Sequence, residues 1–304
     1  MARLSDIAAS ATIRNYAQGA AQNMVQKTIG NFLAPGVDVP TMTGKYKIYT
    51  EKSRYRIPDV RRALGGRAVQ IGWDANDGTF NCTPRALDCP VDIYEAMSEE
   101  TLENAYKEAA DLVAEVAALS HENEVIAKAV ESLTSTDITL GDSTNLISDF
   151  DDAILDIMKA SGFGGSLCIR MLWGATAWKK AKNHKSVIDR LSDTQLKVPS
   201  FETFKNLLIG EPESRCTYAV KDTAPEGKAK ALDFILGNKV LVFVANDSPT
   251  RRDPSFMKTF RLAGEWMKSG TYQSDDGRSE VAKMDWSQDV QVVNGAAAKL
   301  ITLK

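Results

Sequence analysis

The chain has 304 residues, of which 43% are hydrophobic and 25% are charged, and its formal net charge is -3. This composition is typical of a globular protein and excludes disorder as the main state of the chain. No stretch approaches the ~20 consecutive apolar residues of a membrane span, and the first residues lack the apolar core of a secretion signal. The four cysteines form no CxxC pair, so we expect reduced thiols in a cytoplasmic setting.

The N-terminal third of the chain predicts two projecting segments. Residues 1–34 are rich in Ala, Asn and Gln, which predicts a loosely helical arm that orders on contact with a partner. The following APGVDVP stretch forces an extended path. Apolar residues then alternate with polar ones from Tyr46 to Ile48 and again from Val69 to Trp73. This period of two predicts a long two-stranded excursion with a flexible tip at Gly65 and Gly66.

The strongest helical signal covers residues 98–133, where apolar residues recur every three or four positions. At 1.5 Å per residue this helix is a rod of roughly 54 Å, with Ser98 as its cap. His121 is expected on its polar side, and a coiled coil is the competing interpretation. The residues expected to face the core are Leu102, Tyr106, Ala109, Leu112, Val113, Val116, Leu119, Ile126, Ala129 and Leu133.

The remainder of the chain mixes shorter helices and strands. Further helices are predicted over 143–161, 176–183 and 186–191 and from Ser200 onward. Strands are predicted over 167–169, 216–220, 239–244 and 277–303, with a polar loop at 221–230. The fold class is therefore α+β, with one long helix, a mixed sheet and two projecting arms.

Charge is concentrated in two opposite blocks. Residues 45–67 hold eight basic and two acidic residues, a net charge of +6, and residues 95–132 hold ten acidic and two basic residues, a net charge of -8. Blocks of this size suggest a docking pair, within one molecule or between copies, although two solvated faces that never meet are an alternative. The basic candidates are Lys45, Lys47, Lys52, Arg54, Arg56, Arg61, Arg62 and Arg67. The acidic candidates are Glu99, Glu103, Glu108, Asp111 and Glu115.

No motif of an enzyme is present. The chain lacks a phosphate-binding glycine loop, a GxSxG elbow and an HExxH motif. The carboxylates Asp149, Asp151, Asp152 and Asp156 spread over several faces of one predicted helix, which indicates solvation. We therefore expect no enzyme, no cofactor and no metal. The three tyrosines within the basic block leave nucleic-acid binding open as an alternative function.

Several stretches resemble the major capsid proteins of tailed phages, which have the Hong Kong phage-type capsid fold. FLAPGVDVPTMTGKYKIY resembles the start of that family's extended loop, and RRALGG at 61–66 resembles its tip. Two stretches resemble successive sequence motifs of that family's axial domain, namely WGATAWKKAKNHKSVIDRL and FKNLLIGEPESRCTYAV. The segment that follows these motifs in the family is resembled by GNKVLVFVANDSPTRRDPSFMKTFR. The chain departs from the family at Lys185, where the family has proline after the histidine.

This resemblance implies a domain plan and a function. It places an N-terminal arm at 1–40, an extended β-hairpin loop at 41–90 and a peripheral domain with the spine helix at 91–160. An axial domain follows at 161–265, and the return strands of the peripheral domain occupy 266–304. The implied function is a major capsid protein that forms the hexamers and pentamers of an icosahedral shell around phage DNA. The basic loop of one subunit would then lie on the acidic spine-helix region of its neighbour.

The resemblance also implies partners and a location. Besides copies of itself, the chain would meet a separate scaffolding protein, a portal, decoration proteins and non-specifically bound packaged DNA, but no membrane. It would be assembled in the host cytoplasm and reside in the virion capsid. The alternatives are an encapsulin-like nanocompartment shell protein and a DNA-binding protein with a basic arm.

Overall fold

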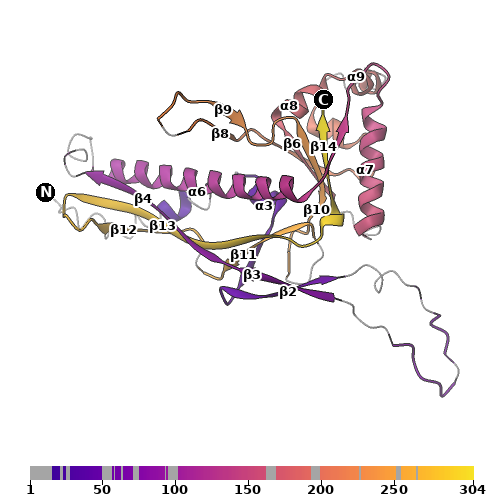
Figure 1. Cartoon of the computed structure of the whole chain (residues 1–304), viewed down its shortest axis with the longest axis horizontal. Coiled ribbons are helices and arrows are strands. Elements are labelled where there is room, and N and C mark those ends of the chain that lie inside the picture. The colour runs from indigo at the N-terminus through magenta and orange to yellow at the C-terminus, as the bar shows by residue number, and fades with distance from the viewer. Residues whose placement is uncertain are drawn as a thin grey trace. The chain divides into compact units, whose positions relative to one another are not determined.

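The computed structural model describes residues 16–20, 23–24, 28–49, 57, 59–62, 64–70, 75–92, 94, 102–161, 169–192, 199–225, 227–250, 255–264 and 266–304. The chain divides into two compact units, each built from several chain segments (Figure 1). Unit 1 comprises Met1–Gly44, Phe80–Glu131 and Lys258–Gln291. Unit 2 comprises Lys45–Thr79, Ser132–Met257 and Val292–Lys304.

Unit 1 is a five-stranded sheet with the long helix α6 (Leu102–Ser132) packed along it. The strand order is β1-β11-β13-β12, and β4 pairs with β13. These strands are β1 (Gly36–Val39), β4 (Thr83–Asp92), β11 (Met257–Leu262), β12 (Lys268–Gln273) and β13 (Ser279–Val292). The small side chains of Ala114 and Ala117 let the helix approach Met284 and Trp286 on β13 closely, and this contact forms a hydrophobic core.

The segment before β1 is also buried in unit 1. The short helix α3 (Gly30–Leu33) buries Phe32 and Leu33, and Ala34 beside it is also buried. The expectation of an arm that orders only on a partner is therefore wrong for these residues, because they are covered by unit 1 of the same chain. Residues 1–15 lie outside the described part.

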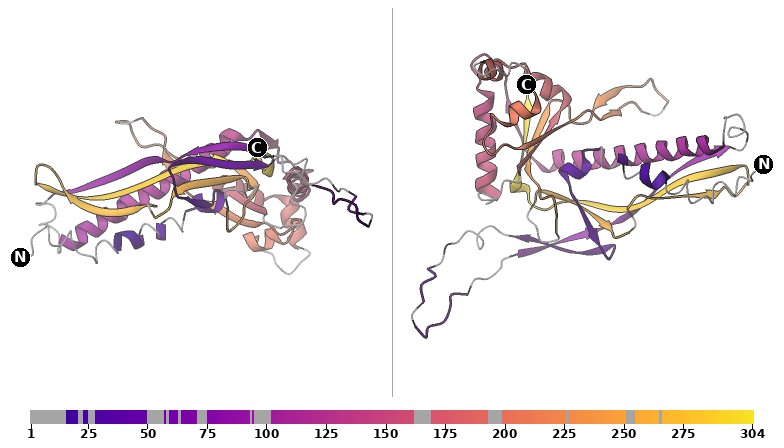
Figure 2. Two further views of the ribbon diagram at one scale, coloured as in Figure 1. Left: turned by 90° about the horizontal axis from the view of Figure 1, so that it is seen from below. Right: turned by 180° about the vertical axis from the view of Figure 1, so that it is seen from behind.

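Unit 2 is a mixed five-stranded sheet of order β5-β14-β10-β6-β7. Its strands are β5 (Ser135–Ile138), β6 (Ile169–Gly174), β7 (Glu213–Thr217), β10 (Lys239–Val244) and β14 (Ala298–Leu303). Its helices are α7 (Leu146–Ser161), α8 (Ala175–Lys182), α9 (Lys185–Ser192), α10 (Phe201–Lys205) and the 3-10 turn η1 (Gly295–Ala297). Figure 2 shows the same elements from two further sides.

An aromatic cluster joins the helices of unit 2 to its sheet. The fully buried ring of Trp173, on β6, lies 5.1 Å from Phe150 of α7 and 5.5 Å from Trp178 of α8, measured between ring centroids. Phe204 of α10 lies 5.3 Å from the same ring. Tilted and edge-on aromatic pairs of this kind add about 0.5–1.5 kcal/mol each beyond their burial, so Trp173 fixes where α7 and α8 sit.

The expected excursion is a hairpin of β2 (Thr43–Tyr49) and β3 (Ala75–Asn81). The ring of Tyr46 covers Gly78, and the ring of Phe80 covers Gly44, where an added Cβ would lie 2.6 Å from Phe80 Cζ. Aromatic rings that cover cross-strand glycines fix the register of such ribbons. Of the strand expected from Val69 to Trp73, residues 69 and 70 are irregular and exposed, residues 71–74 lie outside the described part, and the return strand is described over Ala75–Asn81.

A second ribbon is formed by β8 (Val220–Asp222) and β9 (Leu232–Phe234). The sequence predicted a polar loop over 221–230. The carboxylate of Asp222 accepts hydrogen bonds from the backbone N–H groups of Ala224 and Ala231, 2.9 and 3.0 Å away, which closes the ribbon's turn. These two hydrogen bonds also lower the pKa of Asp222.

The turn from β6 into α8 gives a test of unit 2. A Cβ added at Gly174 would collide with the backbone carbonyl oxygen of Gly237, which cannot rotate away. We expect Gly174→Ala to lower the free energy of unfolding by about 1–3 kcal/mol, measured by urea denaturation. Gly295→Ala is the matched control, since a Cβ there meets nothing within 4 Å. Equal stability of the two variants would contradict this packing.

Candidate subunit-docking surfaces

Some cations of the basic block form ion pairs within the hairpin, and others are exposed. Lys45 and Lys47, on β2, both form ion pairs with Asp77 on β3, and the hydrogen bond from Lys47 lowers the pKa of that carboxyl. Their charge therefore stabilises the hairpin. Arg61, Arg62 and Arg67 are exposed on the irregular segment beyond it. Lys52, Arg54 and Arg56 lie outside the described residues.

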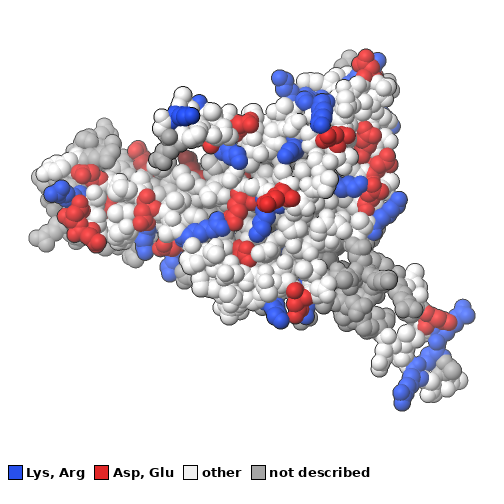
Figure 3. Space-filling view, viewed as in Figure 1, with Lys and Arg blue, Asp and Glu red and all other residues white. Residues whose placement is uncertain are grey.

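The same segment carries exposed apolar side chains among its cations. Ile57, Val60 and Leu64 are almost fully exposed, and Val69 is more than half exposed. Figure 3 shows Lys and Arg side chains gathered on the segment beside uncharged ones. Large apolar side chains exposed next to one another are uncommon unless a partner covers them. The segment 57–70 therefore has the chemistry of a docking surface, both apolar and positively charged.

Fewer carboxylates of the acidic block are free on the surface than the sequence suggested, because some of them are bonded within unit 1. Glu124 of α6 is held by both guanidinium nitrogens of Arg85, at 2.6 and 2.7 Å, and by Gln288 at 2.5 Å. The carboxylate of Asp111 accepts a hydrogen bond of 2.9 Å from the hydroxyl of Tyr16. Glu108 and Glu115 remain exposed. Glu99 and the side chain of Glu103 lie outside the described part.

An apolar stripe lies beside these exposed carboxylates. Leu112, Val116 and Leu119 are 52%, 45% and 38% exposed, although the periodicity predicted that all three face the core. That prediction is wrong because the sheet covers another face of α6, along Tyr106, Val113 and Ala117. Their spacing of four and three residues places the three exposed side chains on one helix face, with Glu108 and Glu115 beside them. We call this set the outer face of α6.

His121 is buried and not on a polar side of α6, contrary to expectation. It is 1% exposed, its ring meets the edge of Trp266 at 5.3 Å, and its Cδ2 lies so close to Gly30 that no Cβ would fit there. Burial lowers its pKa to about 4. The sequence signal that could have found this is the absence of a side chain at Gly30, in the segment that packs on α6.

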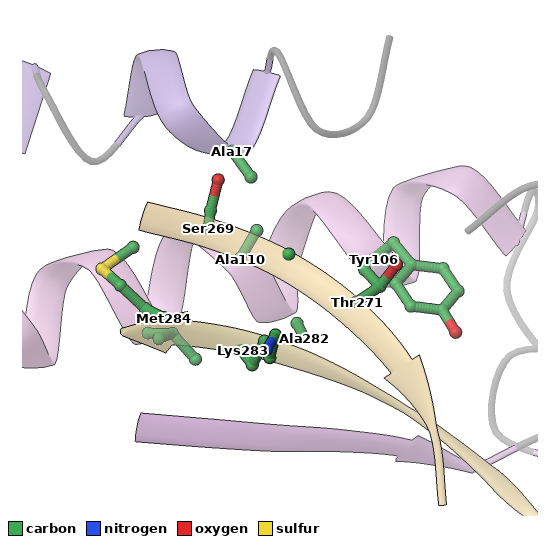
Figure 4. Close-up of a pocket in the computed structure, with 10 residues that line it drawn as sticks. Ala17, Tyr106, Ala110, Ser269, Thr271, Ala282, Lys283 and Met284 are labelled. Carbon is green, nitrogen blue, oxygen red and sulfur yellow. The ribbon is translucent and has the colours of Figure 1, made fainter. Parts of the chain in front are cut away.

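One enclosed cavity of unit 1 is too small to hold a substrate. The cavity in Figure 4 lies between Ala17, Tyr106 of α6 and Thr271 of β12, and its volume of about 10 Å³ is near the minimum for one water molecule. Among the described residues, no group of three or more His, Cys, Asp or Glu side chains could hold a metal ion. No helix in the described part of the chain is long and apolar enough to cross a membrane.

The fold of the chain is similar to that of solved phage proteins. A phage-related protein from Bordetella bronchiseptica is 17% identical, with a TM-score of 0.72 over 96% of each chain. The capsid protein of cyanophage P-SCSP1u is 12% identical, with a TM-score of 0.57 over 91% of this chain and 88% of that one. The chain has the Hong Kong phage-type capsid fold, as the sequence resemblance implied.

This capsid fold is shared with a nanocompartment shell. The SrpI encapsulin of Synechococcus elongatus is 9% identical, with a TM-score of 0.52 over 88% of this chain and 83% of that one. No protein-family model matches the chain, and no curated protein matches it by sequence. Identities this low establish the fold alone.

The burial of His121 predicts a pH dependence of stability. The folded state holds the imidazole neutral with a pKa of about 4, against 6.5 for the unperturbed group, so the unfolded chain binds more protons between these values. The free energy of unfolding should therefore fall by up to about 3 kcal/mol as the pH drops from 6.5 to 4. Urea denaturation at several pH values measures this loss.

His121→Gln is the control for this prediction, because glutamine does not titrate. Burial raises the pKa of Glu280 on β13, and its protonation favours the folded state as the pH falls. Comparison of the variant with the wild type cancels that opposing contribution. The same loss of stability in both proteins would contradict the assignment to His121.

Proposed function

We propose that the chain is a major capsid protein that self-assembles into the hexamers and pentamers of an icosahedral shell around phage DNA. It acts as a structural protein and not as an enzyme. The observation that carries the proposal is the pair of complementary surfaces on one chain of capsid fold. The segment 57–70 is basic and apolar, and the outer face of α6 is acidic and apolar.

The docking of these surfaces takes place between neighbouring subunits in this proposal. Arg61 and Arg62 approach Glu108 and Glu115, while the apolar side chains of the segment cover Leu112. Exposed ion pairs contribute at most about 1 kcal/mol each, so the charges mainly determine how the two surfaces align and how fast two subunits associate. Burial of a leucine or isoleucine side chain contributes about 1.5–3 kcal/mol, so the apolar contacts supply most of the affinity.

Other partners follow from the same function. A scaffolding protein encoded separately, a portal and decoration proteins would bind the shell, and packaged DNA would bind non-specifically inside it. The site of assembly would be the host cytoplasm, and the mature location the virion capsid. The domain plan of arm, extended loop, peripheral domain and axial domain, with the boundaries given above, is part of this proposal.

A nanocompartment shell is the second candidate, because an encapsulin has the same fold. Sedimentation velocity and negative-stain imaging of the purified chain test for shells and for rings of six and five. Nuclease-protected DNA in particles made during infection favours the phage capsid, and packaged enzyme without DNA favours the nanocompartment. A persistent monomer that binds DNA with a steep salt dependence would contradict both candidates and support a DNA-binding protein.

Charge reversal tests the role of the basic segment. We expect Arg61→Glu with Arg62→Glu to abolish shells while the monomer keeps its thermal unfolding temperature, because both side chains are exposed and lie outside either core. Arg61→Lys with Arg62→Lys keeps the charge and should still assemble. Normal shells from the double glutamate variant would show that the segment does not dock through these arginines.

Substitution of the exposed leucines on α6 tests whether the outer face of α6 is part of the interface. Leu112→Ser with Leu119→Ser should weaken assembly at least tenfold in critical concentration, since each lost leucine contact removes more than about 1 kcal/mol. Leu172→Ser, at a fully buried position of β6, is the contrasting variant and should instead unfold unit 2. Light scattering against protein concentration measures the effect. An unchanged critical concentration would exclude the outer face of α6 from the interface.

A further inference from the structure

Unit 2 carries a second pair of complementary surfaces, which the docking of the basic segment does not use. Residues 142–161, which include α7, hold five acidic residues and one lysine, a net charge of -4. Residues 175–192, which form α8 and α9, hold five basic residues and one aspartate, a net charge of +4. Both helical segments belong to the same compact unit.

The acidic surface is one face of α7. Asp149, Asp152 and Asp156 follow at spacings of three and four residues, so they lie on one face, and Phe150 points into the aromatic cluster instead. Asp156 is paired with Lys299 of β14 at 2.5 Å, and this contact lowers the pKa of its carboxyl. Asp149 and Asp152 have no ion-pair partner among the described residues and line a groove of about 440 Å³ between β5 and α7.

The basic surface is formed by the solvent side of α8 and α9. Lys179 and Lys185 are exposed and Lys182 is partly exposed, while Ala177 and Ala181 face the core. None of these three lysines forms an ion pair in the described part of the chain. Ile188 of α9 is an exposed apolar side chain within this surface, as Leu155 is on α7.

No ion pair joins the two surfaces within one copy among the described residues, although α9 packs beside the start of α7, where the Leu146 N–H donates a hydrogen bond to the Ser186 hydroxyl. Phe150 and Trp178 reach the ring of Trp173 from different helices, and in Figure 1 strand β14 lies between α7 and α8. Figure 3 shows acidic side chains along the edge of unit 2 formed by α7. An acidic and a basic surface that form no ion pairs with each other on one compact unit can both be paired by contact with other copies of that unit.

We propose that the acidic face of α7 in one subunit binds the basic α8–α9 surface of the next subunit around each ring. The groove beside Asp149 and Asp152 accepts the long side chains of Lys179 and Lys182. Two different patches in contact form a head-to-tail interface, which generates closed rings when the rotation closes. This inference rests on the proposed shell function and adds a contact through unit 2 that is independent of the basic segment.

Charge exchange tests the contact. Lys179→Glu with Lys182→Glu makes both surfaces acidic, and Asp149→Lys with Asp152→Lys makes both basic. We expect each double variant to lose rings and shells, and the chain that carries all four substitutions to regain them. Size-exclusion chromatography with light scattering measures the ring mass. The thermal unfolding temperature is recorded for each variant, because Asp149→Lys also removes a favourable charge from the first turn of α7.

A mixture of the two double variants adds a sharper test. Subunits of the two kinds must alternate for every interface to pair opposite charges, and alternation closes only in rings with an even number of subunits. An equimolar mixture should therefore form hexamers but neither pentamers nor closed shells. Lys228→Glu with Lys230→Glu, two exposed charges elsewhere in unit 2, is the matched control and should assemble normally.

The outcomes separate this inference from the proposed function. Normal rings from either double variant, or no recovery in the fourfold variant that remains folded, would overturn the α7 to α8–α9 contact alone. Loss of assembly in the control as well would show a general effect of charge and would also overturn it. A wild-type chain that stays monomeric at every concentration would overturn the proposed function and this contact together.

Discussion

The apolar side chains that folding leaves in water are the constraint on which the rest of the structure depends. Each unit has a core of its own, built on Trp286 in unit 1 and Trp173 in unit 2. Yet Ile57 and Leu64 on the basic segment and Leu112 on α6 stay exposed. Exposed apolar surface of this kind is typical of a site where another molecule binds. Self-assembly is the simplest form of such binding.

Charge has a different role from apolar burial in this account. Glu124 and Asp111 are engaged inside unit 1, and Lys45 and Lys47 inside the hairpin, so they contribute to the single chain. The exposed charges include arginines on the segment 57–70 and glutamates on the outer face of α6. Because exposed pairs contribute little affinity, their proposed effect is to select which surfaces bind each other and to suppress wrong pairings. A shell protein needs that selectivity, since every copy presents the same surfaces.

The sequence predicted the long helix, α7 and β10 well, because a periodic apolar pattern depends on local geometry. It could not tell which apolar face of α6 the sheet covers, so Leu112, Val116 and Leu119 were wrongly assigned to the core. The two-stranded excursion was predicted, but not that its return strand covers Ala75–Asn81, because no apolar alternation marks these residues and the ring of Tyr46 over Gly78 is a contact between strands. The charge blocks led to both proposed docking surfaces, but net charge could not show that Glu124 is bonded to Arg85 and that Glu115 is exposed.

A cross-link between subunits tests the central claim most directly. One chain would carry Arg61→Cys and a second, larger tagged chain Glu115→Cys, both with the native cysteines replaced, and the two would be co-assembled under mild oxidation. The account predicts a disulfide-linked heterodimer in assembled particles and none in the unassembled monomers. Particles that form normally without this cross-link would contradict docking of the basic segment on the outer face of α6.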